Sequence, residues 1–267
     1  MPTLLLSQRH SADSNVMWRA AVHAGWDVER IRGYAIDPAL ASGDPVLYGE
    51  TLLADALTAP LGLAFLEPTA DWLPSLPESY RKRAVRLATL ADARALTQPS
   101  FVKPPDEKWF GARVYESGAA LEVAEGMEDE YAVLIAEPVR FEVEYRFFVL
   151  ERAVATGSIY IRGGAIARSG EGEWPADPAE TEAAAAFLQT LLRDPAADLP
   201  AAVVVDVGRI QDRGWAVVEA NPAWASGLCD ADPLAVLEVL RRATVPRAAL
   251  VAADRRWVRA AVGASEA

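Results

Sequence analysis

Two valine-rich runs in the last quarter of the chain constrain its fold most. Residues Ala202–Ile210 form the first run and Trp215–Asn221 the second, with only Gln211–Gly214 between them. Short runs rich in β-branched and aromatic residues, joined by a polar turn, are typical of antiparallel hairpins. The sequence therefore predicts two paired strands here, and the rest of the fold has to be built around them.

The register of this hairpin decides where its polar side chains lie. A two-residue turn at Asp212-Arg213 places Asp206 directly opposite Glu219. Asn221 comes two residues after Glu219 and projects from the same face of the strand. The sequence thus predicts two carboxylates and an amide side by side on one face of the hairpin.

Valines surround both of these acids, and two like charges directly opposite each other destabilise a strand pair. A Mg²⁺ ion between them would replace this repulsion by coordination, because Mg²⁺ prefers carboxylate and carbonyl oxygens. The alternative is an acid pair at a solvated sheet edge that shares a proton or has an arginine nearby. The spacing alone is compatible with both interpretations.

Short strands alternate with helices over the first third of the chain, which indicates an α/β unit. The strands expected there are Leu4–Ser7, Val28–Ile31, Pro45–Tyr48 and Gly62–Leu66, and the helices are 13–24, Glu50–Leu57 and Pro77–Leu96. After Gln98-Pro99 the pattern is richer in strands and indicates an α+β arrangement. The elements expected there are strands Phe101–Lys103, Tyr131–Ala136, Phe141–Leu150 and Ala153–Arg162, and helices Ala179–Arg193 and Pro233–Arg242.

Two further segments supply positive charge. Lys103 ends an apolar strand, and Lys108 follows it in a loop. On the long predicted strand that follows, the period of two places Glu142, Glu144 and Arg146 on one face. A salt-bridged strand surface is one interpretation of this face. Cations and metal-binding acids on separate strands also fit a polyphosphate with magnesium, since phosphoryl transfer depends on well-placed charge.

Composition excludes several other classes of function. The formal net charge of −12 argues against general nucleic-acid binding, which needs a basic surface. The single cysteine, Cys229, excludes an internal disulfide and a multi-cysteine zinc site, and two histidines leave little for a histidine metal centre. No apolar run is long enough to span a membrane, and the first residues lack the features of a signal peptide. We therefore expect a cytoplasmic protein that binds neither membranes nor nucleic acids.

Three sequence blocks resemble the ATP-grasp superfamily and occur in its order: one around Lys103, one around Glu137, and the hairpin with Asp206, Glu219 and Asn221. Phe-Val-Lys103-Pro is similar to the strand whose lysine contacts nucleotide phosphate, and Ala-Glu137-Pro-Val139 to the hinge between subdomains. The resemblance implies that the backbone and acid of the hinge, Glu137 and Val139, bind adenine and that Glu144 binds the ribose hydroxyls. It also implies that Lys103 and Lys108 bind the nucleotide.

The hairpin carries the most specific part of this resemblance. Asp206, Glu219 and Asn221 match the Asp…Glu-x-Asn magnesium set of the superfamily, with a spacing similar to that of D-alanine–D-alanine ligases. This match favours the magnesium interpretation of the acid pair over the solvated edge.

A finer resemblance is to a divergent clade named for two arginines and a lysine, which includes the eukaryotic cell-division-cycle protein that assembles a translation initiation factor. Glu144-Tyr-Arg146, Tyr160-Ile-Arg162 and Glu219-Ala-Asn221-Pro-Ala-Trp224 are similar to its signatures. The implied fold is an N-terminal α/β pre-ATP-grasp domain (1–97) followed by an ATP-grasp domain (98–246). The latter consists of two α+β subdomains (98–137 and 138–246) with the nucleotide between them. We expect residues 247–267 to be a basic tail with a solvated helical face.

The resemblance implies an ATP- and Mg²⁺-dependent carboxylate–amine (or thiol) ligase that forms an acyl-phosphate and releases ADP. Arg146 and Arg162 would stabilise the developing negative charge as catalytic residues. The partners would be ATP, a carboxylate-bearing substrate and an amine acceptor, with peptides and proteins among the candidates. The alternative is a nucleotide-binding assembly factor that grips a protein partner without turnover. The glycine-poor loop between Lys103 and Gly111 favours this alternative.

Overall fold

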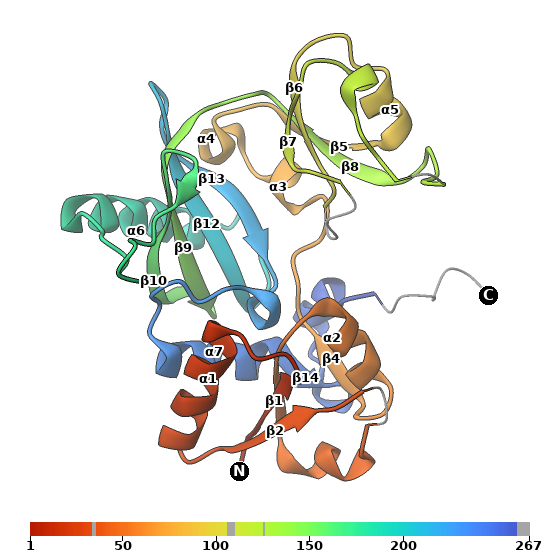
Figure 1. Cartoon of the computed structure of the whole chain (residues 1–267), viewed down its shortest axis with the longest axis vertical. Helices are drawn as coiled ribbons and strands as arrows, with labels where there is room; N and C mark the ends of the chain where they lie inside the picture. Colours follow the sequence, from red (N-terminus) through yellow and green to blue (C-terminus); the bar gives the residue numbers. More distant parts are fainter. Residues whose placement is uncertain (34–35, 106–109, 125, 261–267) are drawn as a thin grey trace.

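The computed structural model describes residues 1–33, 36–105, 110–124 and 126–260. It confirms a mixed α/β architecture with several sheets (Figure 1). Among the described residues, no helix is both long enough and apolar enough to cross a bilayer.

The N-terminal unit is a parallel sheet with helices packed on it. Its strand order is β2-β1-β3, and the elements are β1 (Thr3–Ser7), β2 (Asp27–Ile31), β3 (Pro45–Tyr48), α1 (Ala12–His23) and α2 (Thr51–Thr58). The side chain of Ser11 caps the start of α1 by accepting the Ser14 N–H. Two antiparallel strands, β4 (Leu63–Phe65) and β14 (Thr244–Pro246), connect this unit with the end of the chain.

A four-stranded sheet, called the small sheet here because it is smaller than the five-stranded one, has the order β5-β8-β6-β7. Its elements are β5 (Val85–Thr89), β6 (Ser100–Lys103), β7 (Arg113–Tyr115), β8 (Ala132–Ala136) and α5 (Leu90–Arg94). β5 lies where one long helix, 77–96, was predicted, and that prediction is wrong. Only α3 (Trp72–Ser75), α4 (Glu78–Arg81) and α5 are helical in this region, because α4 ends at Lys82 in the left-handed conformation and β5 then pairs along β8. The domain boundary after residue 97 stays a prediction.

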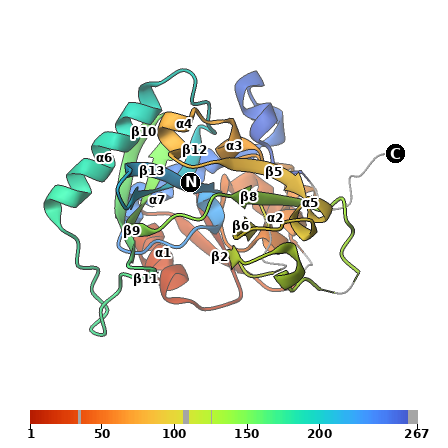
Figure 2. The same ribbon diagram turned by 90° about the horizontal axis from the view of Figure 1, so that it is seen from above.

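The largest sheet is antiparallel, with the order β11-β10-β9-β12-β13. Its strands are β9 (Phe141–Leu150), β10 (Ala153–Arg162), β11 (Ala165–Ile166), β12 (Ala202–Ile210) and β13 (Gly214–Asn221). The helix α6 (Pro178–Arg193) covers one face, and its Leu188 and Leu191 pack among buried valines of β12. Figure 2 shows α6 and the small sheet on opposite sides of the molecule.

The other face of this sheet meets the N-terminal unit. The helix α7 (Pro233–Ala243) contacts α1 and β3 as well as β9 and β12. Phe148 of β9 and Val204 of β12 belong to the same apolar core as α7 and the first sheet. The large sheet therefore has an apolar core under α6 on one face, and its other face is apolar where α7 covers it.

The predicted hairpin is present, but its turn is one residue longer than expected. Ile210 pairs with Gly214, so three residues form the turn instead of Asp212-Arg213 alone. A β-bulge farther along restores the register, and Asp206 pairs with Glu219 as predicted. Two deviations from the expected geometry thus compensate each other.

Within the described residues 247–260, part of the segment expected to be a solvated basic tail is packed against the fold. Trp257 is buried in the same core as α6, while Arg255 and Arg256 beside it are exposed. Arg259 pairs with Asp55 of α2 and with Glu67, and its side chain is only 10% exposed. The sequence pattern missed this because the partners are about two hundred residues away in the chain.

Candidate functional site

The polar residues of the large sheet lie beside the end of its α7-covered face. Alternation along β9 and β12 carries this face from Phe148 and Val204 to Arg146 and Asp206. Beyond α7 this face borders a cavity and a cleft, described below, and its side chains are charged instead of apolar. The fold thus leaves a charged area on an otherwise buried sheet.

Arg146 and Asp206 form a buried ion pair at the centre of this area. The Arg146 Nε and one Nη donate to the two Asp206 carboxylate oxygens over 2.9 and 2.7 Å. The guanidinium also lies over the Tyr160 ring, 4.2 Å from its centroid. Burial raises the pKa of Asp206, and the guanidinium opposes this effect by stabilising the carboxylate. The two-pronged geometry fixes the carboxylate in one orientation.

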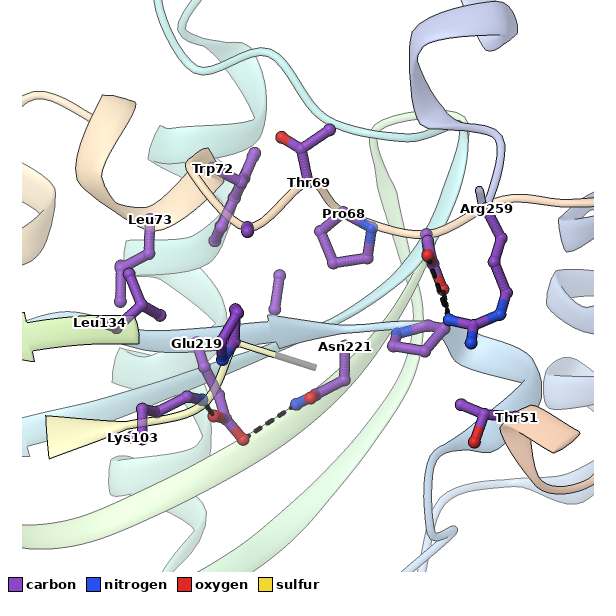
Figure 3. A pocket seen from close by; sticks show the side chains of 15 residues that line it. Thr51, Pro68, Thr69, Trp72, Leu73, Lys103, Leu134, Glu219, Asn221 and Arg259 are labelled. Atoms are coloured by element: carbon purple, nitrogen blue, oxygen red, sulfur yellow. Dashed lines mark hydrogen bonds and ion pairs between the residues drawn. The ribbon is translucent and has the colours of Figure 1, made fainter. Parts of the chain in front are cut away.

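Glu219 and Asn221 extend this cluster toward Lys103 of the small sheet (Figure 3). The Lys103 Nζ contacts Glu219 Oε2, and the Asn221 amide donates to Glu219 Oε1 over 3.0 Å and to Asp206 Oδ2 over 3.5 Å. Burial opposes ionisation of Glu219, but Lys103 and Asn221 outweigh it and lower its pKa to about 2. The three predicted metal ligands therefore lie together on one face.

A cavity of about 500 Å³ lies between the small sheet and the large sheet. Lys103, Glu137, Val139 and Glu144 all line it. Its apolar wall comes from both sheets: Val85, Phe101, Leu134, Ala136, Phe141 and Ile161. Burial, together with the charges of Asp206 and Glu219, raises the pKa of Glu144 to about 7. A cavity with flat apolar walls and a lysine at its border is suited to a nucleotide.

A second, more open cleft of about 810 Å³ lies on the other side of the carboxylates, against the N-terminal unit. Arg146, Glu219 and Asn221 line it on one side, and Asp13 and Glu50 on the other. Tyr160 and Glu219 border both the cleft and the 500 Å³ cavity. Molecules bound in the cavity and in the cleft would therefore meet at Asp206, Glu219 and Asn221, called the carboxylate cluster here.

Comparison with known protein families identifies the family of the chain. Residues 80–239, more than half of the chain, match an ATP-grasp domain family, described as family 2 of the clade named for two arginines and a lysine. The chain belongs to this family. No curated protein matches the sequence.

Solved ATP-grasp structures share the fold over nearly the whole chain. A RimK domain ATP-grasp protein from Sphaerobacter thermophilus DSM 20745 is 20% identical, with a TM-score of 0.50 over 91% of this chain and 97% of that one. D-alanine–D-alanine ligase from Bacillus anthracis is 11% identical, with a TM-score of 0.51 over 91% and 97%. D-cycloserine synthetase DcsG is 15% identical, with a TM-score of 0.51 over 90% and 99%. At these identities the likeness establishes the ATP-grasp fold alone.

Arg162 is a predicted site residue that this ATP-grasp fold does not bring to the cluster. A bulge at Tyr160 shifts the pairing of β10, so that Arg162 stands opposite Val143 and faces α6. There it pairs with Glu180 over 2.7 Å. This placement does not support a catalytic role for Arg162, and Tyr160 takes the position over Arg146.

Of three further predicted residues, one turns away from the site, one lies at its border and one is outside the described residues. A bulge on β9 turns Glu142 toward Arg209 on the α6 face, away from Glu144 and Arg146 with which it was grouped. The carboxylate of Glu137 is held by Arg213 over 2.6 Å at the border of the cavity. Lys108 lies outside the described residues.

Arg83 is a residue of this site that the sequence did not indicate. Its side chain is buried, lines the 500 Å³ cavity and lies 5.1 Å from the centroid of the Phe141 ring. Burial lowers its pKa to about 10, so it remains charged at neutral pH. It falls in the segment that was wrongly predicted to be helical, where neighbouring arginines and lysines gave no reason to single it out.

The carboxylate cluster fits the magnesium ion that ATP-grasp proteins imply. No group of three or more His, Cys, Asp and Glu side chains suited to a metal occurs among the described residues, so a site here has to include an amide. Asp206, Glu219 and Asn221 provide two carboxylates and an amide, which are hard oxygen donors. The Asn221 N–H groups already lie between the two carboxylates, where positive charge is favoured.

Proposed function

We propose that this ATP-grasp protein is an ATP- and Mg²⁺-dependent ligase that joins a carboxylate to an amine or thiol, with release of ADP. The observation that supports the proposal best is the shared face of Asp206, Glu219 and Asn221, which lies between a nucleotide-sized cavity and an open cleft. A catalyst for transfer between two bound molecules needs charge at the place where they meet.

The nucleotide would occupy the 500 Å³ cavity. Its base would lie against the apolar wall near Glu137 and Val139, its ribose near Glu144, and its phosphates would point toward Lys103. Lys103 would then leave Glu219 and bind phosphate oxygen. Asp206, Glu219 and Asn221 would hold Mg²⁺, which neutralises phosphate charge when bound.

The substrates would bind in the cleft beside Arg146. A carboxylate oxygen attacks the γ-phosphorus, the bond from this phosphorus to the bridging oxygen breaks, and ADP leaves. The amine then attacks the acyl carbon, phosphate departs, and the nitrogen loses a proton. The Arg146 guanidinium, fixed by Asp206, would stabilise the negative charge that develops on oxygen.

The test is ADP release in a screen of amino acids and peptides, with ATP and Mg²⁺ present. We expect substrate-dependent release by the wild type and its loss in Asp206→Asn and Glu219→Gln. Glu182→Gln is the matched control, because this exposed acid lies on α6. Full turnover in both site variants, or ATP binding without turnover across the screen, would contradict the ligase.

A further inference from the structure

The bulge on β13 is what brings Glu219 to the face of Asp206. Val207 pairs with Val217, whereas the next pair is Asp206 with Glu219. Val218 is therefore an extra residue with no partner on β12. The pairing of Glu219 with Asp206 therefore depends on this one inserted residue.

Without the bulge, every residue beyond it would turn to the opposite face of the sheet. Glu219 would then stand opposite Val205, whose side chain is buried in the core with α6. Asn221 would turn with it. A carboxylate in that apolar core would bind no cation, so the bulge is a requirement of the site.

Arg83 binds the backbone of this bulge from outside the sheet. One Nη donates to the Val217 carbonyl over 2.7 Å, and the other donates to the Val218 carbonyl over 2.9 Å. A bulge interrupts the ladder of a strand, and β13 is an edge strand, so these carbonyls need another donor. The forked guanidinium supplies two donors in fixed geometry, which an ammonium group cannot.

The residues around the bulge are shaped to admit it. Gly208 lies on β12 beside Glu144, and a Cβ there would come within 3.1 Å of Val218 Cγ2 and 2.6 Å of Phe141 Cδ1. The absence of a side chain at this position gives room to Val218 and to the Phe141 ring on which Arg83 packs. Arg83, Phe141 and Gly208 thus form one support for the bulge.

We propose that Arg83 is a positioning residue, which holds the bulge at Val218 and so keeps Glu219 and Asn221 on the cation-binding face. This inference rests on the proposed function, because it concerns the same cation site. Arg83 acts through the backbone that carries Glu219.

The experiment measures Mn²⁺ affinity by EPR titration of the full chain saturated with a non-hydrolysable ATP analogue. Arg83→Lys retains the positive charge and loses the fork, and Arg83→Met loses both. Arg86→Met is the matched control, since this exposed arginine lies on β5 close in sequence. We expect Arg83→Lys to bind Mn²⁺ about 10–100-fold more weakly, as for other residues that orient metal ligands. Because Arg83 also lines the nucleotide cavity, the analogue affinity is measured without the cation as well, and it should fall by less than the Mn²⁺ affinity. Arg86→Met should match the wild type.

Two further measurements separate positioning from other roles. In a Glu219→Gln background, Arg83→Lys should weaken Mn²⁺ binding by less than it does in the wild type, because only Asn221 then still depends on the bulge. In the metal-free protein, hydrogen exchange of the Val218 and Glu219 amides should be faster in Arg83→Lys than in Arg86→Met. The lysine variant keeps the test valid if Arg83→Met fails to fold.

The outcomes distinguish the inference from the function on which it rests. If the wild type binds no Mn²⁺ with the analogue, the proposed function is wrong. If the wild type binds Mn²⁺ and Arg83→Lys binds it equally well, the positioning role is wrong. A loss of cation-free analogue affinity in Arg83→Lys as large as its loss of Mn²⁺ affinity would show that Arg83 acts on the nucleotide instead, and this would also overturn the inference.

Discussion

Replacing Lys103 by methionine should increase the affinity of the nucleotide-free protein for a divalent cation. Lys103 contacts Glu219, one of the proposed ligands, and so occupies the place of a cation. The cluster of Lys103, Arg146, Asp206 and Glu219 has no net charge while Lys103 is present. Lys103→Met changes this to −1 and leaves Glu219 free to coordinate.

The size of the effect follows from the exposure of the ion pair. The side chains of Lys103 and Glu219 are 19% and 28% exposed, so water and salt screen the pair only in part. A hydrogen bond to a charged group contributes about 1.5–3 kcal/mol, and we take the lower end for a partly exposed pair. Because 1.4 kcal/mol corresponds to tenfold, Mn²⁺ should bind about tenfold more tightly.

The assay is Mn²⁺ titration followed by EPR, without and with a non-hydrolysable ATP analogue. Lys82→Met is the control, because Lys82 is a cation that bonds to the Arg213 carbonyl outside the cluster. With the analogue, Lys103→Met should bind nucleotide more weakly, since the phosphates lose a cation. Equal or weaker Mn²⁺ binding by nucleotide-free Lys103→Met would refute the idea that Lys103 competes for Glu219.

Three further predictions concern stability in urea unfolding. Arg146→Met should lower the free energy of unfolding by about 3–5 kcal/mol at pH 7, because it leaves the buried Asp206 carboxylate without its arginine. The loss should be smaller at pH 4, where Asp206 can protonate. Equal losses at the two pH values would contradict this. Glu144 has its pKa raised from 4.5 to about 7 in the folded state, so it favours folding below pH 4.5, and this contribution is lost as the pH rises toward 7. Glu144→Gln should therefore stabilise the protein at pH 8, by at most about 3 kcal/mol, and little at pH 4; a gain independent of pH would count against it. Arg259→Met should cost about 2–3 kcal/mol through its lost bonds to Asp55, whereas a change below about 0.5 kcal/mol would mean that the final segment is not part of the folded core.

The sequence predicted the main strands that carry the site and many of the residues that the structure brings together there. The strands Phe141–Leu150, Ala153–Arg162 and Ala202–Ile210 have the predicted bounds, because alternating apolar residues between turn signals report a strand locally. The pairing of Asp206 with Glu219 is also confirmed. The roles of these residues as metal ligands stay predictions.

Only the tertiary structure decided which face several residues occupy. Bulges at Glu142, Tyr160 and Val218 each break the period of two, and they turn Arg162 to α6 and Glu219 to Asp206. A bulge depends on what the neighbouring elements leave room for and bond to, so a local pattern does not contain it.

Contacts between residues far apart in the chain could likewise not be predicted from the sequence. Lys103 meets Glu219, and Arg83 meets Val217 and Val218, across more than a hundred residues of chain. A linear pattern reports the interactions of near neighbours, whereas these contacts exist only once separate sheets have packed together. The sequence by itself thus determined the strands of the large sheet that carry the site and the chemistry of their side chains, and packing determined which of those side chains share a site.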